Sequence, residues 1–163
     1  MIVPFESLPS VRRTHEDEQI VFAGGCYDLI HEGHVESLEW RRSQGDLLVV
    51  GVSSDERVEQ RKGPGRPIRS ELGRLAVISA FRAVDYAFLM PLPNEQTPTM
   101  QVLSTLRPNI FIDSTESRER WLEEQEAMHA LGVTLQFDEQ EKRDSTTDII
   151  KRVHAARIEN TNL

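Results

Sequence analysis

The chain has 163 residues, of which 38% are hydrophobic and 28% are charged, a composition typical of a globular domain that buries a core of ordinary size. Its net charge of −8 argues against nucleic acid as a partner, because binding to a phosphate backbone needs a basic surface. No apolar run approaches the ~20 residues of a membrane helix, and the single cysteine excludes an internal disulfide. We therefore expect a cytoplasmic protein without a membrane partner.

In chain order, residues 1–18 come first; they mix Pro, Ser and charges and are expected to form a leader or short helix outside the core. Five apolar runs follow, at residues 20–23, 47–52, 86–90, 110–112 and 133–137. They are rich in β-branched or large residues and do not alternate between apolar and polar positions. This pattern is typical of parallel strands that are covered on both faces.

Helices are predicted between and after these strands, at residues 34–44, 72–83, 97–106, 117–131 and 146–157. Several of them end at Gly or just before Pro, as helices commonly do. Because strand and helix alternate, we predict an α/β fold with a doubly wound, five-stranded parallel sheet of the Rossmann-like type. Its ligand should bind at the carboxyl ends of the strands. We assign residues 19–158 to one domain and 159–163 to a flexible tail.

The segment 25–34, GCYDLIHEGH, lies where the first strand passes into a helix. It places His31 and His34 at the helix N-terminus, where free N–H groups and the helix dipole favour a polyphosphate. Gly33 between them lets a ligand approach the backbone closely. Neither a Rossmann dinucleotide motif nor a P-loop is present. Zinc held by Cys26 and the two histidines is disfavoured, since no second Cys/His cluster completes the ligand set, and we predict no metal site in the protein.

With Tyr27 in place of a phenylalanine, this segment resembles Gly-x-Phe-Asp-x-x-His-x-Gly-His, the signature of the cytidylyltransferase-like family of nucleotidyltransferases. Later segments resemble further motifs of that family in the same order: a lysine-bearing loop at 57–67, a helix ending in Arg-x-Val-Asp at 70–85, and a Ser-Thr-Thr loop at 145–150. The likeness is greatest to the adenylyltransferase domains of bifunctional heptose kinase/adenylyltransferases. It is slightly smaller to glycerol-3-phosphate cytidylyltransferases.

This resemblance implies a HUP-type fold, a homodimer and a reaction with an NTP and Mg²⁺. A nucleoside monophosphate, with AMP favoured, would pass to a phosphorylated small molecule such as a heptose 1-phosphate, and pyrophosphate would leave. Cytidylyl transfer to glycerol 3-phosphate or another alcohol or sugar phosphate is the alternative reaction. A nucleotide-binding module without turnover and a plain interaction domain also stay open.

The resemblance also implies roles for individual residues. The catalytic residues would be His31, His34 and Lys62. Lys62 would lie on a cationic flap that closes on the α-phosphate. The alternative for this loop is a solvated hairpin tip. The nucleotide would be bound by Gly25, Cys26, Tyr27, Asp28, Gly33, Arg74, Arg82, Ser145, Thr146 and Thr147. Ordinary structural alternatives are a turn cap for Asp28, snorkelling surface positions for Arg74 and Arg82, and a helix N-cap for residues 145–147.

Departures from the family pattern fall mainly where the acceptor and the triphosphate should meet. Heptose-type relatives carry Lys-Gly-Gly-Asp after the fourth strand, whereas this chain has Asp113, Ser114, Thr115 and Glu116. Arg143 replaces a glycine just before the Ser-Thr-Thr loop, and Arg41 replaces an alanine on the first helix. The simplest interpretation is a different acceptor. Asp113 would bind a hydroxyl or amine, Glu116 would keep a carboxylate in place, and Arg143 would take over a phosphate contact; loss of activity is the other interpretation.

Overall fold

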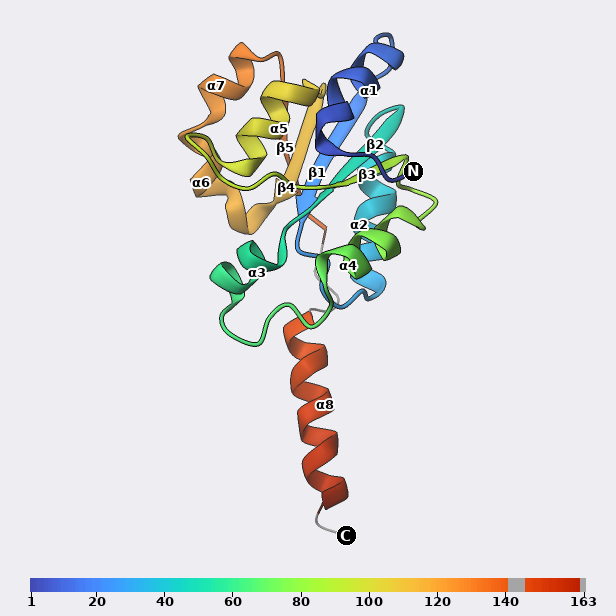
Figure 1. The fold of residues 1–163 in the computed structure, drawn as a ribbon, viewed down its shortest axis with the longest axis vertical. Coiled ribbons are helices and arrows are strands. Elements are labelled where there is room, and N and C mark those ends of the chain that lie inside the picture. Colours follow the sequence, from blue (N-terminus) through green and yellow to red (C-terminus); the bar gives the residue numbers. More distant parts are fainter. Residues whose placement is uncertain (141–145, 162–163) are drawn as a thin grey trace.

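The computed structural model describes residues 1–140 and 146–161, with side chains up to residue 156 in the last helix. One all-parallel sheet has five strands in the order β3-β2-β1-β4-β5 (Figure 1). The strands are β1 Ile20–Gly25, β2 Leu47–Val52, β3 Tyr86–Leu89, β4 Ile110–Ser114 and β5 Thr134–Asp138. The predicted Rossmann-like sheet is therefore confirmed, and the bounds of every strand agree with the prediction to within two residues.

Both faces of the sheet are covered by helices. Successive residues of a strand point to opposite faces, so β1 sends Ile20 and Phe22 into one hydrophobic core and Val21 and Ala23 into another. The first core is closed by α1 Leu8–Thr14, α5 Pro98–Leu106, α6 Arg118–Leu122 and α7 Gln125–Ala130. The second is closed by α2 Glu32–Arg42 and α4 Glu71–Ser79. Burial on both faces explains why the strands show no alternation in the sequence.

The strand order places a crevice between β1 and β4. From β1 the chain adds β2 and β3 on one side of the sheet, and then returns to add β4 and β5 on the other. Loops that leave the carboxyl ends of β1 and β4 therefore diverge to opposite faces. In open α/β sheets, this switch point is where ligands bind.

Part of the segment 1–18 packs into the core, which corrects the expectation that the whole segment lies outside it. Leu8 of α1 is fully buried and Val11 is 6% exposed, both in the core that α5 also closes. The Val3 N–H donates to the Ala87 carbonyl of β3 at 3.0 Å. A short 3₁₀ turn, η1 Phe5–Ser7, joins this contact to α1. The packing of α1 could not be predicted from the sequence, because only two of its positions are buried.

The helix predicted at 117–131 is interrupted. A 3₁₀ turn, η2 Thr115–Ser117, leads into α6, and α7 begins only at Gln125. The Glu124 N–H donates to the Trp121 carbonyl, three residues back instead of four, so the α-helical hydrogen-bond pattern is interrupted there. Glu119 and Glu123 would stand one turn apart in a continuous helix, and like charges at that spacing are unfavourable.

Two more helices complete the fold. α3 Asp55–Lys62 follows β2, in a segment for which the sequence suggested a loop, and α8 Thr146–Thr161 begins where it was predicted. α8 extends away from the sheet (Figure 1). Within the described residues, no helix is both long and apolar enough to cross a membrane.

Candidate active site

A cavity of about 510 Å³ opens at the carboxyl ends of β1 and β4. This volume lies within the usual range for small-molecule sites. Its walls come from the β1–α2 connection, from α3, from the segment after β4 and from the start of α8. Among the predicted site residues, its lining includes Gly25, Cys26, Tyr27, His31, Gly33, His34, Lys62, Asp113, Glu116, Thr146 and Thr147. The structure thus brings together residues that are more than 100 positions apart in the chain.

His31 and His34 form a pair of adjacent imidazoles in this cavity. Their ring centroids lie 4.0 Å apart, with the ring planes at 48°. His31 is the extended residue just before α2, and His34 lies in the first turn of that helix. The His31 Nδ1 atom is buried and makes no hydrogen bond with any residue that the structure describes. Since a buried polar atom without a partner is costly, this nitrogen marks a place where a ligand atom can bind.

Tyr27 lies in the same wall with its ring against Gly25. A Cβ atom at Gly25 would come within 2.7 Å of the Tyr27 Cζ atom, so only glycine fits there. Tyr27 itself has a φ of 51°, which few residues with side chains adopt. Burial, which outweighs the field of Arg41, raises the pKa of its phenol, and the hydroxyl therefore stays protonated. This hydroxyl is buried and has no hydrogen-bond partner among the described residues.

We expect Tyr27→Phe to leave the free energy of unfolding unchanged, or to raise it by up to about 1 kcal/mol, because no hydrogen bond is lost. Urea unfolding measures this change. Tyr86→Phe is the matched control: the Tyr86 hydroxyl contacts His15 Nε2 at 2.9 Å, and its loss should destabilise the protein by about 1 kcal/mol. Equal losses in the two variants would contradict the assignment of Tyr27 as an unpaired donor.

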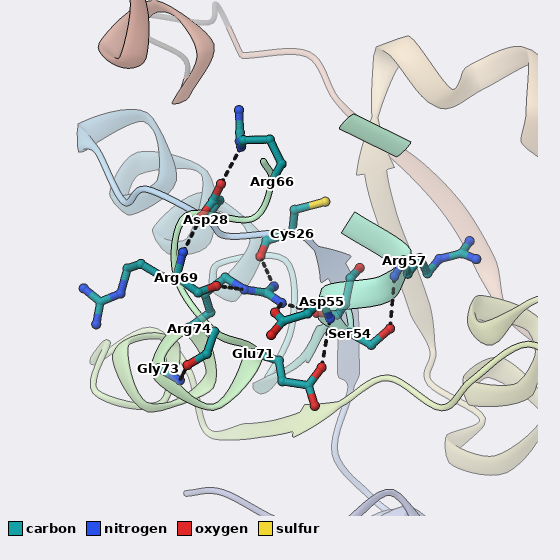
Figure 2. A network of polar contacts seen from close by, with 12 residues as sticks. Cys26, Asp28, Ser54, Asp55, Arg57, Arg66, Arg69, Glu71, Gly73 and Arg74 are labelled. Carbon is teal, nitrogen blue, oxygen red and sulfur yellow. Dashed lines mark hydrogen bonds and ion pairs between the residues drawn. The ribbon is translucent and has the colours of Figure 1, made fainter. Parts of the chain in front are cut away.

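Asp28 holds the segment after α3 against the histidine loop. Its carboxylate is 2% exposed and accepts hydrogen bonds from Arg66 Nε at 2.7 Å and from the backbone N–H groups of Ile68 and Arg69 at 2.8 and 3.1 Å (Figure 2). All these contacts are within the protein, and Asp28 does not line the cavity. Asp28 therefore has a structural role, as the alternative interpretation held. It fixes the segment 66–69 in place and does not cap a turn.

Arg74 is the centre of the same network (Figure 2). It is 1% exposed, and its guanidinium donates to the backbone carbonyls of Cys26, Ser53 and Arg69 and to the Asp55 carboxylate. It thus ties the ends of β1 and β2 to the first residue of α3. Both interpretations from the sequence, a snorkelling surface residue and a cation facing the nucleotide, are contradicted: Arg74 is buried, and it is absent from the cavity lining.

Arg82 lies elsewhere. α4 ends at Ser79, earlier than predicted, because the N–H groups of Ala80 and Phe81 bond to carbonyls three residues back. Arg82 is therefore in the turn after the helix, exposed, on a shallow surface beside α2. Its predicted place at the nucleotide is not supported, since the cavity lining does not include it.

Lys62 is the last residue of α3 and is exposed at the cavity. Ser54 caps the N-terminus of this helix by accepting a hydrogen bond from the Arg57 N–H at 3.3 Å, and Asp55 and Glu56 follow in the first turn. This capping pattern was the available signal for the helix. The spacing of apolar residues did not indicate this helix, because Val58 is its only buried residue. Gly63 then leaves the helix at a φ of 91°, a conformation that suits glycine.

The residues after β4 have mixed roles. The Asp113 carboxylate accepts hydrogen bonds from Trp121 Nε1 and from the Ser114 N–H, and lies 3.6 Å from Arg120 Nη2. It therefore anchors α6 as well as lining the cavity. Glu116 is exposed at the rim. At the start of α8, the Thr146 hydroxyl donates to the Leu29 carbonyl at 3.1 Å. Arg143 and Ser145 lie outside the described residues.

Sequence reasoning missed a buried ion pair in the cavity wall. Arg41 and Asp138 are each about 9% exposed at the side chain, and Arg41 Nε lies 3.3 Å from Asp138 Oδ2. Ser37 donates to the same oxygen at 2.6 Å. The arginine was noticed as a departure on α2, but its partner lies at the end of β5, 97 residues away. Only the folded sheet brings the two together.

Fold and site together define a class of protein. The sheet is Rossmann-like, and an imidazole pair at the N-terminus of α2 faces a cleft that also holds Lys62 and the hydroxyl-bearing start of α8. Such a cleft suits the polyphosphate of a nucleotide. The pantothenate synthetase of Thermus thermophilus has the same fold, with a TM-score of 0.58 and 14% identity over 84% of this chain and 60% of that one.

The chain belongs to the cytidylyltransferase-like family, whose model matches residues 22–152, and it is a nucleotidyltransferase. It is 37% identical over 141 residues to the bifunctional protein HldE of Pseudomonas fluorescens, covering 86% of this chain and 28% of that protein. The chain thus spans only about a quarter of such relatives. A lipopolysaccharide core biosynthesis protein from Thermoplasma volcanium has a TM-score of 0.64 and 30% identity, over 78% of this chain and 99% of that one.

Proposed function

We propose that this protein transfers AMP from ATP to a sugar phosphate such as a heptose 1-phosphate and releases pyrophosphate. The observation that carries the proposal is the imidazole pair, 4.0 Å apart, with an unpartnered His31 nitrogen in the cleft. The resemblance of the motifs to those of heptose adenylyltransferase domains supports ATP as the donor and a sugar phosphate as the acceptor. The family match, which is named for cytidylyl transfer, favours CTP with glycerol 3-phosphate or another alcohol phosphate as the second candidate.

In this reaction, an oxygen of the acceptor phosphate attacks the α-phosphorus of the nucleotide. The new P–O bond forms as the bond from the α-phosphorus to the bridging oxygen breaks, and pyrophosphate leaves with that electron pair. No covalent enzyme intermediate is needed, so positioning and charge stabilisation carry the catalysis. We infer that His31, His34 and the N-terminus of α2 hold the triphosphate. Lys62 then neutralises charge that develops at the α-phosphate.

We further propose that Mg²⁺ arrives as part of the substrate, bound to the triphosphate, since Mg²⁺ commonly binds through phosphates with few protein ligands. Within residues 1–140 and 146–156, whose side chains the structure describes, no three or more His, Cys, Asp or Glu side chains gather closely enough to hold a metal ion. A homodimer in the cytoplasm, acting in carbohydrate metabolism, remains part of the proposal. Light scattering tests the dimer.

The reaction is tested by pyrophosphate release from ATP or CTP with Mg²⁺ and a panel of sugar 1-phosphates and glycerol 3-phosphate. We expect turnover with ATP and a sugar phosphate. Lys62→Gln should lower the rate by about 10²-fold, as loss of a transition-state donor does, with an unchanged melting temperature because the residue is exposed. Lys151→Gln is the matched control, since Lys151 lies on α8 with its side chain 74% exposed.

Thermal stabilisation by nucleotide without pyrophosphate from any acceptor would identify a binding module and overturn the enzymatic proposal. No stabilisation by either nucleotide would leave a plain interaction domain.

A further inference from the structure

Three arginines face the cleft and have no role in the mechanism above. Arg57 and Arg61 come from α3, and Arg120 comes from α6, on the far side of β4 in the sequence. Figure 2 shows the Arg57 side chain directed away from the network around Asp28 and Arg74. Within the described residues, the side chains of Arg57 and Arg61 make no hydrogen bond or ion pair. Arg120 packs on the Trp121 ring at 4.0 Å and lies 3.6 Å from Asp113.

These guanidinium groups lie close enough to repel one another. Partial burial lowers the pKa of Arg57, and the charges of Arg61 and Arg120 lower it further. Burial also lowers the pKa of Arg120; Asp113 opposes that shift and Arg61 adds to it. The three cations are therefore electrostatically coupled to one another.

The positions of the two α3 arginines are unfavourable for the helix itself. Arg57 lies in the first turn, where the positive end of the helix dipole disfavours a cation. Arg57 and Arg61 are also one turn apart, and like charges at this spacing destabilise a helix. The two acids of the first turn make their contacts elsewhere: Asp55 pairs with Arg74, and Glu56 accepts a hydrogen bond from Gln60. The arginines thus cost stability in the free protein, and a bound anion would recover it.

We propose that Arg57, Arg61 and Arg120 form a second anion site, which binds an anionic group of the acceptor other than the phosphate that attacks the nucleotide. This inference rests on the proposed function. It narrows the acceptor to molecules that carry a phosphate together with a carboxylate or a second phosphate. Guanidinium groups suit both, since they donate paired hydrogen bonds to either anion.

Three flexible probes of similar length test the proposal: glycerol 3-phosphate, 3-phosphoglycerate and 1,3-propanediol bisphosphate. Their dissociation constants are measured by calorimetry, with and without an ATP analogue that has a non-cleavable α,β bridge. We expect the two probes with a second anion to bind about 10- to 100-fold more tightly than glycerol 3-phosphate, as charge-assisted hydrogen bonds allow. The tighter of the two identifies the carboxylate or the phosphate as the preferred group.

In Arg57→Gln/Arg61→Gln, and separately in Arg120→Gln, this gain should fall to less than about threefold, while binding of glycerol 3-phosphate stays the same. Arg118→Gln is the matched control, because Arg118 is on the same helix as Arg120 but pairs with Glu139 outside the cleft lining. Equal binding of all three probes by the native protein would overturn the proposal, and so would a gain that survives in the variants. Failure of the ATP analogue to bind would count against the proposed function. The second anion site would still be tested, because the three probes are also compared without the analogue.

Discussion

Arg74→Met is expected to lower the free energy of unfolding by about 3 to 5 kcal/mol, because methionine fills a similar volume but leaves three buried or part-buried carbonyl oxygens without their donor. The carbonyls concerned belong to Cys26, Ser53 and Arg69. The ion pair with Asp55 adds little, since that carboxylate is 43% exposed. Urea unfolding measures the change from the transition midpoint at constant slope.

Arg69→Met is the control for this experiment, because Arg69 is exposed and contributes only backbone groups to the network. It should change the unfolding free energy by less than about 0.5 kcal/mol. Arg74→Lys should recover only part of the loss, since one ammonium group cannot reach acceptors placed for a planar fork. A loss below about 1 kcal/mol in Arg74→Met would show that the network does not hold the ends of β1 and β2 together.

His34→Ala is expected to reduce the rate of pyrophosphate release by about 10²- to 10³-fold, because a positioned donor to the triphosphate is lost. His31→Ala should have an effect of the same size, since the two rings lie side by side at 4.0 Å. Stopped assays at saturating nucleotide give the turnover number. Substrate titration then separates this effect from weaker binding.

The control for the histidine variants is His129→Ala, because His129 is exposed on α7 and does not line the cleft. It should retain full turnover and the native melting temperature. His34→Asn keeps a hydrogen-bond donor and should recover part of the rate. If His34→Ala kept a tenth or more of the native rate with sugar phosphate acceptors, the imidazole pair would not be the catalytic centre.

The sheet could be predicted from the sequence because parallel strands are encoded locally. Runs such as Leu47–Val52 are apolar at every position, and burial on both faces requires that pattern. The histidine motif was equally local, since its residues are within one turn of each other. The fold class and the place of the cleft followed from these two features.

Contacts between distant segments could not be predicted. Arg74 has its partners at the ends of β1 and β2, and a buried helical arginine gives no sign in the sequence of which carbonyls it will meet. Arg57 and Arg120 come together only because α3 and α6 both follow strands that end at one edge. The packing of α1 into the core was not predicted, because only Leu8 and Val11 bury its inner face.

A structure of the protein with Mg²⁺ and a non-cleavable ATP analogue tests the central claim most directly. We predict that triphosphate oxygens lie within hydrogen-bond distance of the His31 and His34 rings and of the first N–H groups of α2, with Lys62 turned toward the α-phosphate. A triphosphate bound elsewhere in the cleft, with both imidazole rings free of it, would contradict the account.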